Sequence, residues 1–257
     1  MITHNYHVHT HRCKHAKGQD RDYVEAAMQA GFTEIAFTDH SPWPLLEQEK
    51  GLIRMKLTML PDYVNSLRQL REEYKDRISI KIGLECEYFA DRSEWLKDTI
   101  KQYKLDYVIL GNHFHEVETF QRDYSSYLDK ENLLCDYVND SLAAIQSGIY
   151  AYFAHPDIFV RSLTQWDENA EMASRIILEA CKKAGIPVEY NLGGIRNPYY
   201  DLSYPYPRFW QIASEIKNEV MVGIDAHSPM DFHDKKRICE AIHFLASLGI
   251  QVSDRTL

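Results

Sequence analysis

Residues 78–85 read Ile-Ser-Ile-Lys-Ile-Gly-Leu-Glu, an apolar run that ends in a carboxylate. The run predicts a strand over residues 78–84, with Glu85 at its carboxyl end. That is an awkward place for an unpaired carboxylate, and a salt bridge at the rim of the fold would explain it. The alternative is a carboxylate whose two oxygens bridge two cations. The rest of the chain decides between the two interpretations.

The same pattern recurs along the chain, where short apolar runs are followed by groups that could bind or catalyse. The predicted strands cover residues 6–9, 34–38, 78–84, 106–110, 150–154, 187–190 and 220–224. The polar groups at their ends are His7/His9, Asp39/His40, Glu85/Glu87, His113/His115, His155, Glu189/Asn191 and Asp225/His227. Between the strands, helical spacing of apolar residues and stop signals predict helices, most clearly over residues 62–74, 168–184 and 231–248.

Alternating strands and helices predict a mainly parallel sheet with crossover helices. An open sheet would concentrate its polar groups at one switch point. Here all seven predicted strands carry them at their carboxyl ends, which is where α/β barrels place their active sites. We therefore predict an α/β barrel in which residues 1–257 form a single domain.

Composition narrows the class of protein. The chain has 257 residues, of which 45% are apolar, and no apolar run approaches the roughly 18–20 residues that cross a bilayer. The N-terminus is polar and lacks an apolar signal segment, and the five cysteines are scattered without a Cys-x-x-Cys pair. We expect a cytoplasmic protein with free thiols. The net charge of −9 argues against binding to long nucleic acids, but a small anionic substrate fits if positive charge is local.

Two histidine motifs indicate metal binding. On a strand, the two-residue spacing of His7 and His9 points both imidazoles to one side, and Asp225 and His227 repeat that spacing. Each of these groups alone could be an ordinary surface or structural residue. That interpretation does not explain why all of them occur at successive strand ends. Imidazole and carboxylate without thiolate suit Zn, Fe or Mn, and the number of groups predicts at least two ions. His4 and His11 are expected to be exposed or to lie behind the ligands.

These motifs, in this order, resemble those of the PHP (polymerase and histidinol phosphatase) superfamily, and within it the monofunctional histidinol-phosphatase branch. The resemblance covers nearly the whole chain. It rests on His7-Val8-His9-Thr10 with Cys13-Lys14-His15, Thr38-Asp39-His40-Ser41-Pro42, Gly83-Leu84-Glu85, Gly111-Asn112-His113-Phe114, Ala154-His155-Pro156-Asp157 and Gly223-Ile224-Asp225-Ala226-His227. It implies a distorted (β/α)7 TIM-like barrel. Asn5 departs from the family pattern, because many members have Asp two residues before the first ligand.

The resemblance further implies three divalent transition-metal ions. One ion would be held by His7, His9, Glu85 and Asp225. Glu85 would bridge to a second ion bound by His113 and His155, and the third would be held by His15, His40 and His227.

The branch rests on residues 189–198, which read Glu-Tyr-Asn-Leu-Gly-Gly-Ile-Arg-Asn-Pro. Arg161 and Arg196 would clamp the substrate phosphate, because guanidinium forks match phosphate oxygens; the alternative is a pair of surface arginines. Residues 43–61 would form part of the pocket wall. The implied reaction is hydrolysis of L-histidinol phosphate to L-histidinol and phosphate, with Asp225 or a nearby histidine such as His227 protonating the leaving group.

Three other functions stay open at this point. One is a PHP phosphoesterase acting on phosphotyrosine, nucleotides or short oligonucleotides, of which the acidic balance disfavours the nucleic-acid version. The second is a non-catalytic barrel that binds metal for stability, against which the intact ligand set speaks. The third is a barrel amidohydrolase, which usually uses a carboxylated lysine, and no lysine stands in that role at a predicted strand end.

Overall fold

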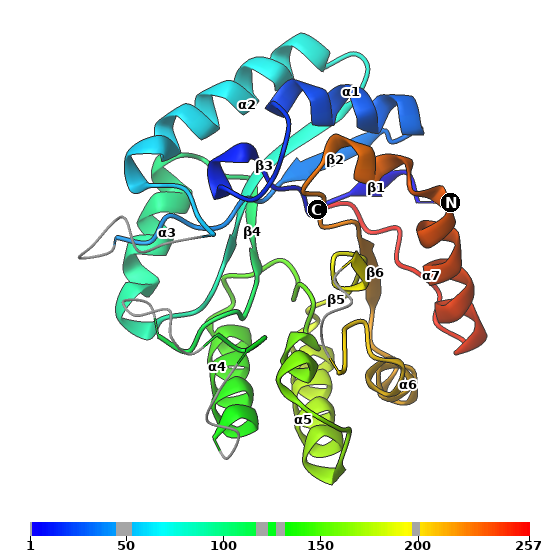
Figure 1. The fold of residues 1–257 in the computed structure, drawn as a ribbon. Helices are drawn as coiled ribbons and strands as arrows, with labels where there is room; N and C mark the ends of the chain where they lie inside the picture. The colour runs from blue at the N-terminus through cyan, green and yellow to red at the C-terminus, as the bar shows by residue number, and fades with distance from the viewer. Residues whose placement is uncertain (1, 45–52, 117–122, 127–131, 197–200) are drawn as a thin grey trace.

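A computed structural model describes residues 2–44, 53–116, 123–126, 132–196 and 201–257. Its strands form a curled parallel sheet, and the helices lie around the outside of that sheet (Figure 1). The strands are β1 (His4–Asn5), β2 (Glu34–Phe37), β3 (Ser79–Cys86), β4 (Tyr107–Leu110), β5 (Val188–Asn191) and β6 (Val220–Gly223). The α-helices are α1 (Asp20–Ala30), α2 (Leu60–Tyr74), α3 (Ser93–Gln102), α4 (Leu133–Ser147), α5 (Glu168–Ala184), α6 (Pro207–Ile216) and α7 (Lys235–Ser247).

The strand order is sequential and every pairing is parallel. Strands β1 to β4 form one sheet and β5 pairs with β6. Phe153 links the two parts through single parallel bridges to Leu110 and Val188. On the other side, Val8 bridges to Ala226 just beyond β6, and the amide of His9 donates to the carbonyl of Ala226 at 2.9 Å. The sheet is therefore curled in the manner of a distorted TIM-like barrel.

Two of the predicted strands do not form as continuous strands over the predicted residues. The strand expected over residues 6–9 is β1 at residues 4–5 followed by one bridge at Val8, and that expected over residues 150–154 consists of bridges at Phe153. At β1 the physical reason is the side chain of Asn5. Its Oδ1 accepts from the amide of Ile224 at 2.8 Å, and its Nδ2 donates to the carbonyl of His7 at 3.0 Å. This amide thus replaces ladder bonds between the segment after β1 and the segment after β6, and a carboxylate could not make the second bond.

The helix predictions hold where sequence signals are local. Helix α5 spans residues 168–184 as expected: Asp167 caps its start by accepting from the amide of Ala170 at 2.9 Å, and Gly185 ends it with φ +68°. The prediction that the last helix begins at residue 231 is wrong. Ser228 and Asp231 form a capping box on a short 3-10 helix (Pro229–His233), and α7 starts after Asp234. No α-helix in the described parts of the chain is long and apolar enough to cross a membrane.

Two clusters of buried residues form the core. The larger lies between the strands and the surrounding helices and includes side chains from every helix. The smaller consists of strand and strand-end residues alone: Tyr6, Ala36, Tyr107, Ile109, Tyr152, Ala154 and Met221. In it, the hydroxyl of Tyr152 donates to the carbonyl of Tyr6 at 3.0 Å. The smaller cluster thus packs side chains of β2, β4 and β6 and of neighbouring segments against one another.

Candidate active site

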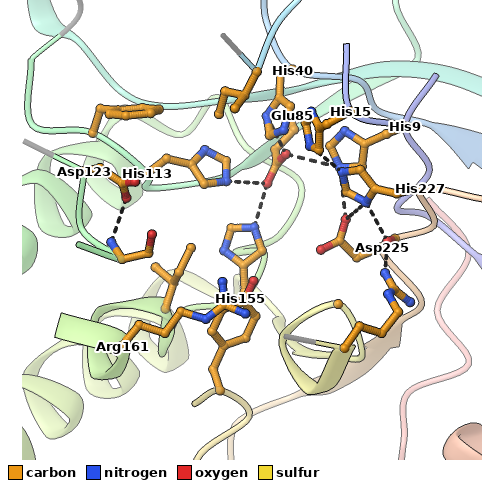
Figure 2. A pocket seen from close by; sticks show the side chains of 17 residues that line it. His9, His15, His40, Glu85, His113, Asp123, His155, Arg161, Asp225 and His227 are labelled. Carbon is orange, nitrogen blue, oxygen red and sulfur yellow. Dashed lines mark hydrogen bonds and ion pairs between the residues drawn. The ribbon is translucent and has the colours of Figure 1, made fainter. Parts of the chain in front are cut away.

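The carboxyl ends of the strands surround a pocket of about 310 Å³ (Figure 2). Its lining comes from segments spread over the whole chain. The described residues that line it are His9, His15, His40, Ile53, Glu85, His113, Phe114, Asp123, Ser125, His155, Ile158, Arg161, Gly193, Arg196, Tyr204, Asp225 and His227. His7 lies fully buried behind them. All nine residues predicted from the resemblance as metal ligands therefore gather in one place.

The centre of the site is a group of four ligand atoms. The prediction that His7 and His9 point to the same side is confirmed, because their Nε2 atoms lie 3.1 Å apart. Asp225 Oδ1 lies 3.5 Å from His7 Nε2 and 3.0 Å from His9 Nε2, and Glu85 Oε2 lies 3.5 and 3.6 Å from the same two nitrogens. Ligands of a tetrahedral ion with bonds of about 2.0–2.1 Å stand about 3.3 Å apart. These spacings fit a metal ion.

The orientation of these groups supports the same conclusion. Glu85 Oε2, Asp225 Oδ1 and His40 Nδ1 are buried polar atoms without a hydrogen-bond partner in the described chain, although charged neighbours are near. Glu85 Oε2 and His40 Nδ1, for example, are 3.0 Å apart without the alignment of a hydrogen bond. Buried polar atoms are rarely left unpaired. Atoms that are close together yet do not face one another fit lone pairs directed at a cation between them.

Two further groups complete the cluster. Glu85 Oε1 lies 2.7 Å from His155 Nε2 and 3.2 Å from His113 Nε2. At the rim, His227 Nε2 lies 2.8 Å from His15 Nε2, and these two histidines form with His40 a set of potential metal ligands. The spacing of residues in the sequence gave no reason to expect His15 in this cluster. Only the family resemblance implied that His15 is a metal ligand.

Carboxylates stand behind two of the histidines and hold their outer nitrogens. Glu189 approaches His7 Nδ1 at 3.0 Å, and Glu87 approaches His113 Nδ1 at 3.1 Å. Such contacts fix the orientation of a ligand imidazole and raise its basicity. The sequence showed both carboxylates as strand-end groups but gave them no partners, because Glu189 and His7 are 182 residues apart.

A buried ion pair in turn holds Glu87 in place. Glu87 and Arg54 are 1% and 2% exposed, and the guanidinium Nη2 lies 2.9 Å from Glu87 Oε1. Trp43 Nε1 donates to Glu87 Oε2 at 2.7 Å. Trp43 and Arg54 belong to residues 43–61, which the sequence assigned to the pocket wall. Of that range, Ile53 lines the pocket and residues 45–52 lie outside the described residues.

Replacing Arg54 should therefore destabilise the protein strongly. We expect Arg54→Met to lower the free energy of unfolding by about 3–5 kcal/mol, because it leaves a buried carboxylate without its counter-charge. The double variant Arg54→Met/Glu87→Gln should lose less than the sum of the two single variants. Urea denaturation of all four proteins measures this. The exposed pair Lys97–Glu94 on α3 is the control, and the same cycle there should give less than about 1 kcal/mol; equal couplings at the two pairs would contradict the expectation.

The charges of the metal-free site are distributed unevenly. Burial alone would lower the pKa of His7 and His113, but Glu189 at His7 and Glu85 at His113, with other carboxylates, raise the pKa of both to about 10. Burial holds the pKa of His40 and of His227 well below the usual value. Burial would raise the pKa of Glu85, but the surrounding histidines hold it well below its ordinary value. Metal ions bind unprotonated imidazole, so loading this site displaces protons.

The backbone at the site adopts unusual conformations. His155 has φ +32° and Asp225 has φ +53°, values that non-glycine residues rarely take. Each such residue costs about 1–3 kcal/mol and persists only where the surrounding structure fixes it, often at functional sites. Glycine is also required nearby: a Cβ at Gly111 would collide with the carboxylate of Glu85, and one at Gly193 with that of Asp225. Both ligands thus depend on a close approach of the neighbouring backbone.

The two arginines predicted to clamp phosphate both line the pocket. The Arg161 guanidinium stacks over the ring of Tyr204 at 4.3 Å, and its Nη2 donates to the carbonyl of Gly194 at 3.2 Å. Arg196 donates from Nη1 to the carbonyl of Ile224 at 3.1 Å and from Nη2 to that of Asp225. Arg161 therefore stands at the pocket on an aromatic support, whereas Arg196 also holds the end of β6. The sequence gave no indication of Tyr204.

Cysteine 13 is a second residue whose position the sequence did not reveal. It is fully buried, and its sulfur forms with His9 and His227 a group whose ligand atoms lie within 4.8 Å of one another. Its spacing in the motif of residues 7–15 was visible, but the direction of its side chain was not. Of the segment 189–198, Asn197 and Pro198 lie outside the described residues.

The chain is similar to several known proteins. The sequence profile of the PHP domain family matches residues 5–192. The "Probable histidinol-phosphatase" of Deinococcus radiodurans is 28% identical over 228 residues, which are 87% of this chain and 85% of that protein. The histidinol-phosphatase of Bacillus subtilis strain 168 is 26% identical over 251 residues, which are 88% and 93% of the two chains. A solved histidinol phosphate phosphatase of Lactococcus lactis, complexed with zinc, L-histidinol and phosphate, matches with a TM-score of 0.73 at 22% identity, over 97% of this chain and 95% of that one.

Proposed function

Because this chain belongs to the PHP domain family, we propose that it is a metal-dependent phosphatase that hydrolyses L-histidinol phosphate to L-histidinol and phosphate. The observation that carries the proposal is the cluster of imidazoles and carboxylates at the strand ends, with Arg161 and Arg196 beside it in a single small pocket. Relatives that match most of the chain are named for this activity, and the solved relative from Lactococcus lactis holds zinc, L-histidinol and phosphate.

The nine clustered residues provide three adjoining places for divalent ions. We assign His7, His9, Glu85 and Asp225 to the first, and Glu85, His113 and His155 to the second. His15, His40 and His227 take the third. The shared ligand is Glu85, since Oε2 faces the first group and Oε1 the second. Zn, Fe and Mn all suit these donors.

The proposal extends to the fold and the location of the protein. We propose that the curled sheet is a distorted (β/α)7 barrel, with the segment around Phe153 as its remaining strand, and that residues 1–257 form one domain. Three of the five cysteines are buried, and all five are free thiols. Free thiols suit the reducing cytoplasm.

Hydrolysis forms a bond between water oxygen and phosphorus and breaks the bond from phosphorus to the alcohol oxygen. Bound divalent ions would supply positive charge at the phosphoryl oxygens and increase the acidity of water at the site. The chain's own residues perform the remaining tasks. Arg161 offers N–H groups to the phosphoryl oxygens, over which the negative charge of the phosphoryl group is spread in the transition state. The leaving alkoxide needs a proton, for which we propose Asp225 and His227. His227 Nδ1 lies 3.3 Å from Asp225 Oδ1, and the imidazole is partly exposed at the pocket.

The test is phosphate release from a panel of monoesters, with metal analysis of the same sample. The panel contains L-histidinol phosphate, phosphotyrosine and a nucleoside monophosphate. We expect the metal-loaded protein to prefer L-histidinol phosphate in kcat/KM. A protein that carries its metals and releases no phosphate from L-histidinol phosphate, yet hydrolyses another ester well, would refute the substrate.

Metal removal should lower the thermal stability of the protein. An ion present at about 100 times its Kd adds about 2.7 kcal/mol, and about 2–4 °C accompany each kcal/mol in a chain of this size. Stripping even one of the ions should thus lower Tm by about 5–10 °C. Differential scanning fluorimetry before and after chelation measures the change, and Tm should recover when zinc is returned. An unchanged Tm in a sample shown by metal analysis to be empty would contradict the ligand assignment.

A further inference from the structure

Asp123 places a carboxylate in the pocket, away from the histidine cluster. Its backbone pairs with that of Phe114 in an antiparallel bridge, and the amide of Tyr124 donates to the carbonyl of His113 at 2.7 Å. Asp123 Oδ1 accepts from the amide of Ser125 at 2.7 Å, which fixes the side chain. In Figure 2 Asp123 lies on the left of the pocket, whereas Asp225 and His227 lie on the right. The position follows from backbone pairing next to a ligand histidine.

Asp123 differs from the other two carboxylates that line the described part of the pocket. Glu85 and Asp225 each face several imidazoles, at distances down to 2.7 and 3.0 Å. Within the described residues, no Lys, Arg or His nitrogen lies within 4.0 Å of Asp123. A site that bound only phosphate would be weakened by such a carboxylate, because like charges repel. A carboxylate at this position would instead favour a substrate that carries a positive charge away from its phosphate.

Apolar side chains also line this pocket. They are Phe114, Ile53 and Ile158, and Phe114 is the residue whose backbone pairs with Asp123. A hydrocarbon or aromatic part of a substrate would bury its surface against them. The pocket thus has the two arginines and the proposed metal ions to bind a phosphate and apolar side chains to contact a ring. The carboxylate of Asp123 is left to bind a positively charged group.

From this arrangement we propose that Asp123 binds the ammonium group of the substrate and makes the enzyme selective for aminoalkyl phosphates. The proposal rests on the function proposed above and adds a residue that determines its specificity. An alkylammonium is mostly charged near pH 8, whereas an imidazole with a pKa of about 6.5 is then mostly neutral. The ammonium is therefore the group that a carboxylate attracts most strongly, and the ring is left for the apolar wall.

The experiment compares three esters with metal-loaded enzyme at pH 8. L-histidinol phosphate has both the ammonium and the imidazole, 3-(imidazol-4-yl)propyl phosphate lacks the ammonium, and 3-phenylpropyl phosphate lacks both. We expect Asp123→Asn to lower kcat/KM about 10- to 100-fold for L-histidinol phosphate, mainly through KM, because a charge-assisted hydrogen bond is lost. The other two esters should change less than about twofold. Asp98→Asn, which removes the same charge from an exposed position on α3, is the matched control and should affect none of them.

The remaining outcomes separate the two proposals. Equal losses for all three esters would show that Asp123 has only a structural role, and a loss for both imidazole esters would assign it to the ring. Either result overturns the proposal for Asp123 and leaves the phosphatase intact. The same holds for a wild-type enzyme that hydrolyses the three esters with equal kcat/KM. A wild type that carries its metals and hydrolyses none of the three refutes the proposed function together with the role of Asp123.

Discussion

Glu85→Gln should lower kcat/KM for L-histidinol phosphate by about 10⁴-fold, the largest effect we expect from one substitution. Glu85 contacts more of the cluster than any other carboxylate among the described residues. Its oxygens lie 2.7–3.6 Å from nitrogens of His155, His40, His113, His7 and His9. An amide removes the negative charge and replaces one ligand oxygen with an N–H₂ group that cannot bind a cation. Two of the proposed ions would lose a ligand at once.

Metal analysis by mass spectrometry provides the second measurement for this variant. We expect Glu85→Gln to lose at least one ion per chain, while its circular dichroism spectrum stays that of a folded protein. Glu94→Gln is the matched control, because the Glu94 side chain is 82% exposed on α3 and makes only a surface ion pair. A Glu85→Gln protein that retains its full metal content and activity within tenfold of the wild type would show that Glu85 is not the shared ligand.

Arg161→Ala should lower kcat/KM about 10²- to 10³-fold, mainly by raising KM. Two charge-assisted hydrogen bonds to phosphate would be lost, each of about 1.5–3 kcal/mol before the site readjusts. Arg161→Lys should recover only part of the loss, because an ammonium cannot bind two oxygens as a fork and stacks less well on Tyr204. Steady-state kinetics and inhibition by inorganic phosphate measure both effects.

Arg161 is a cleaner test of the phosphate clamp than Arg196, which also holds the backbone carbonyls of Ile224 and Asp225. The control is Arg175→Ala on α5, a partly exposed arginine whose partners are Glu171 and Glu215. It should leave KM unchanged. A normal KM in Arg161→Ala would contradict the clamp, and the stacking on Tyr204 would then be structural only.

The sequence predicted those parts of the fold and site that depend on local pattern. The end of helix α5 could be placed because Gly185, followed by Pro187, is a local stop signal. The shared direction of His7 and His9 follows from strand geometry, and the structure confirms it. The same local logic placed polar groups at the carboxyl ends of the strands, which is why the pocket could be foreseen.

The parts that the sequence did not predict depend on contacts between distant segments. Nothing near Glu189 in the chain indicates that it faces His7, and nothing near Glu87 indicates Arg54 as its partner. The early end of β1 also depends on a distant contact, since the side chain of Asn5 accepts a hydrogen bond from the amide of Ile224, just beyond β6. Such pairings are set by how the sheet curls, and that geometry exists only in the folded chain.

The pairing of Val8 with Ala226, 218 residues later in the chain, has a consequence for protein synthesis. Val8 pairs with Ala226, and the proposed metal ligands run from His7 to His227. A nascent chain on the ribosome therefore carries His7 and His9 long before Asp225 and His227 leave the exit tunnel. Until then it holds only fragments of the site, which bind ions less tightly than the complete set. Chains that terminate early should thus lack the full metal complement, so that phosphatase activity is confined to proteins translated nearly to the end.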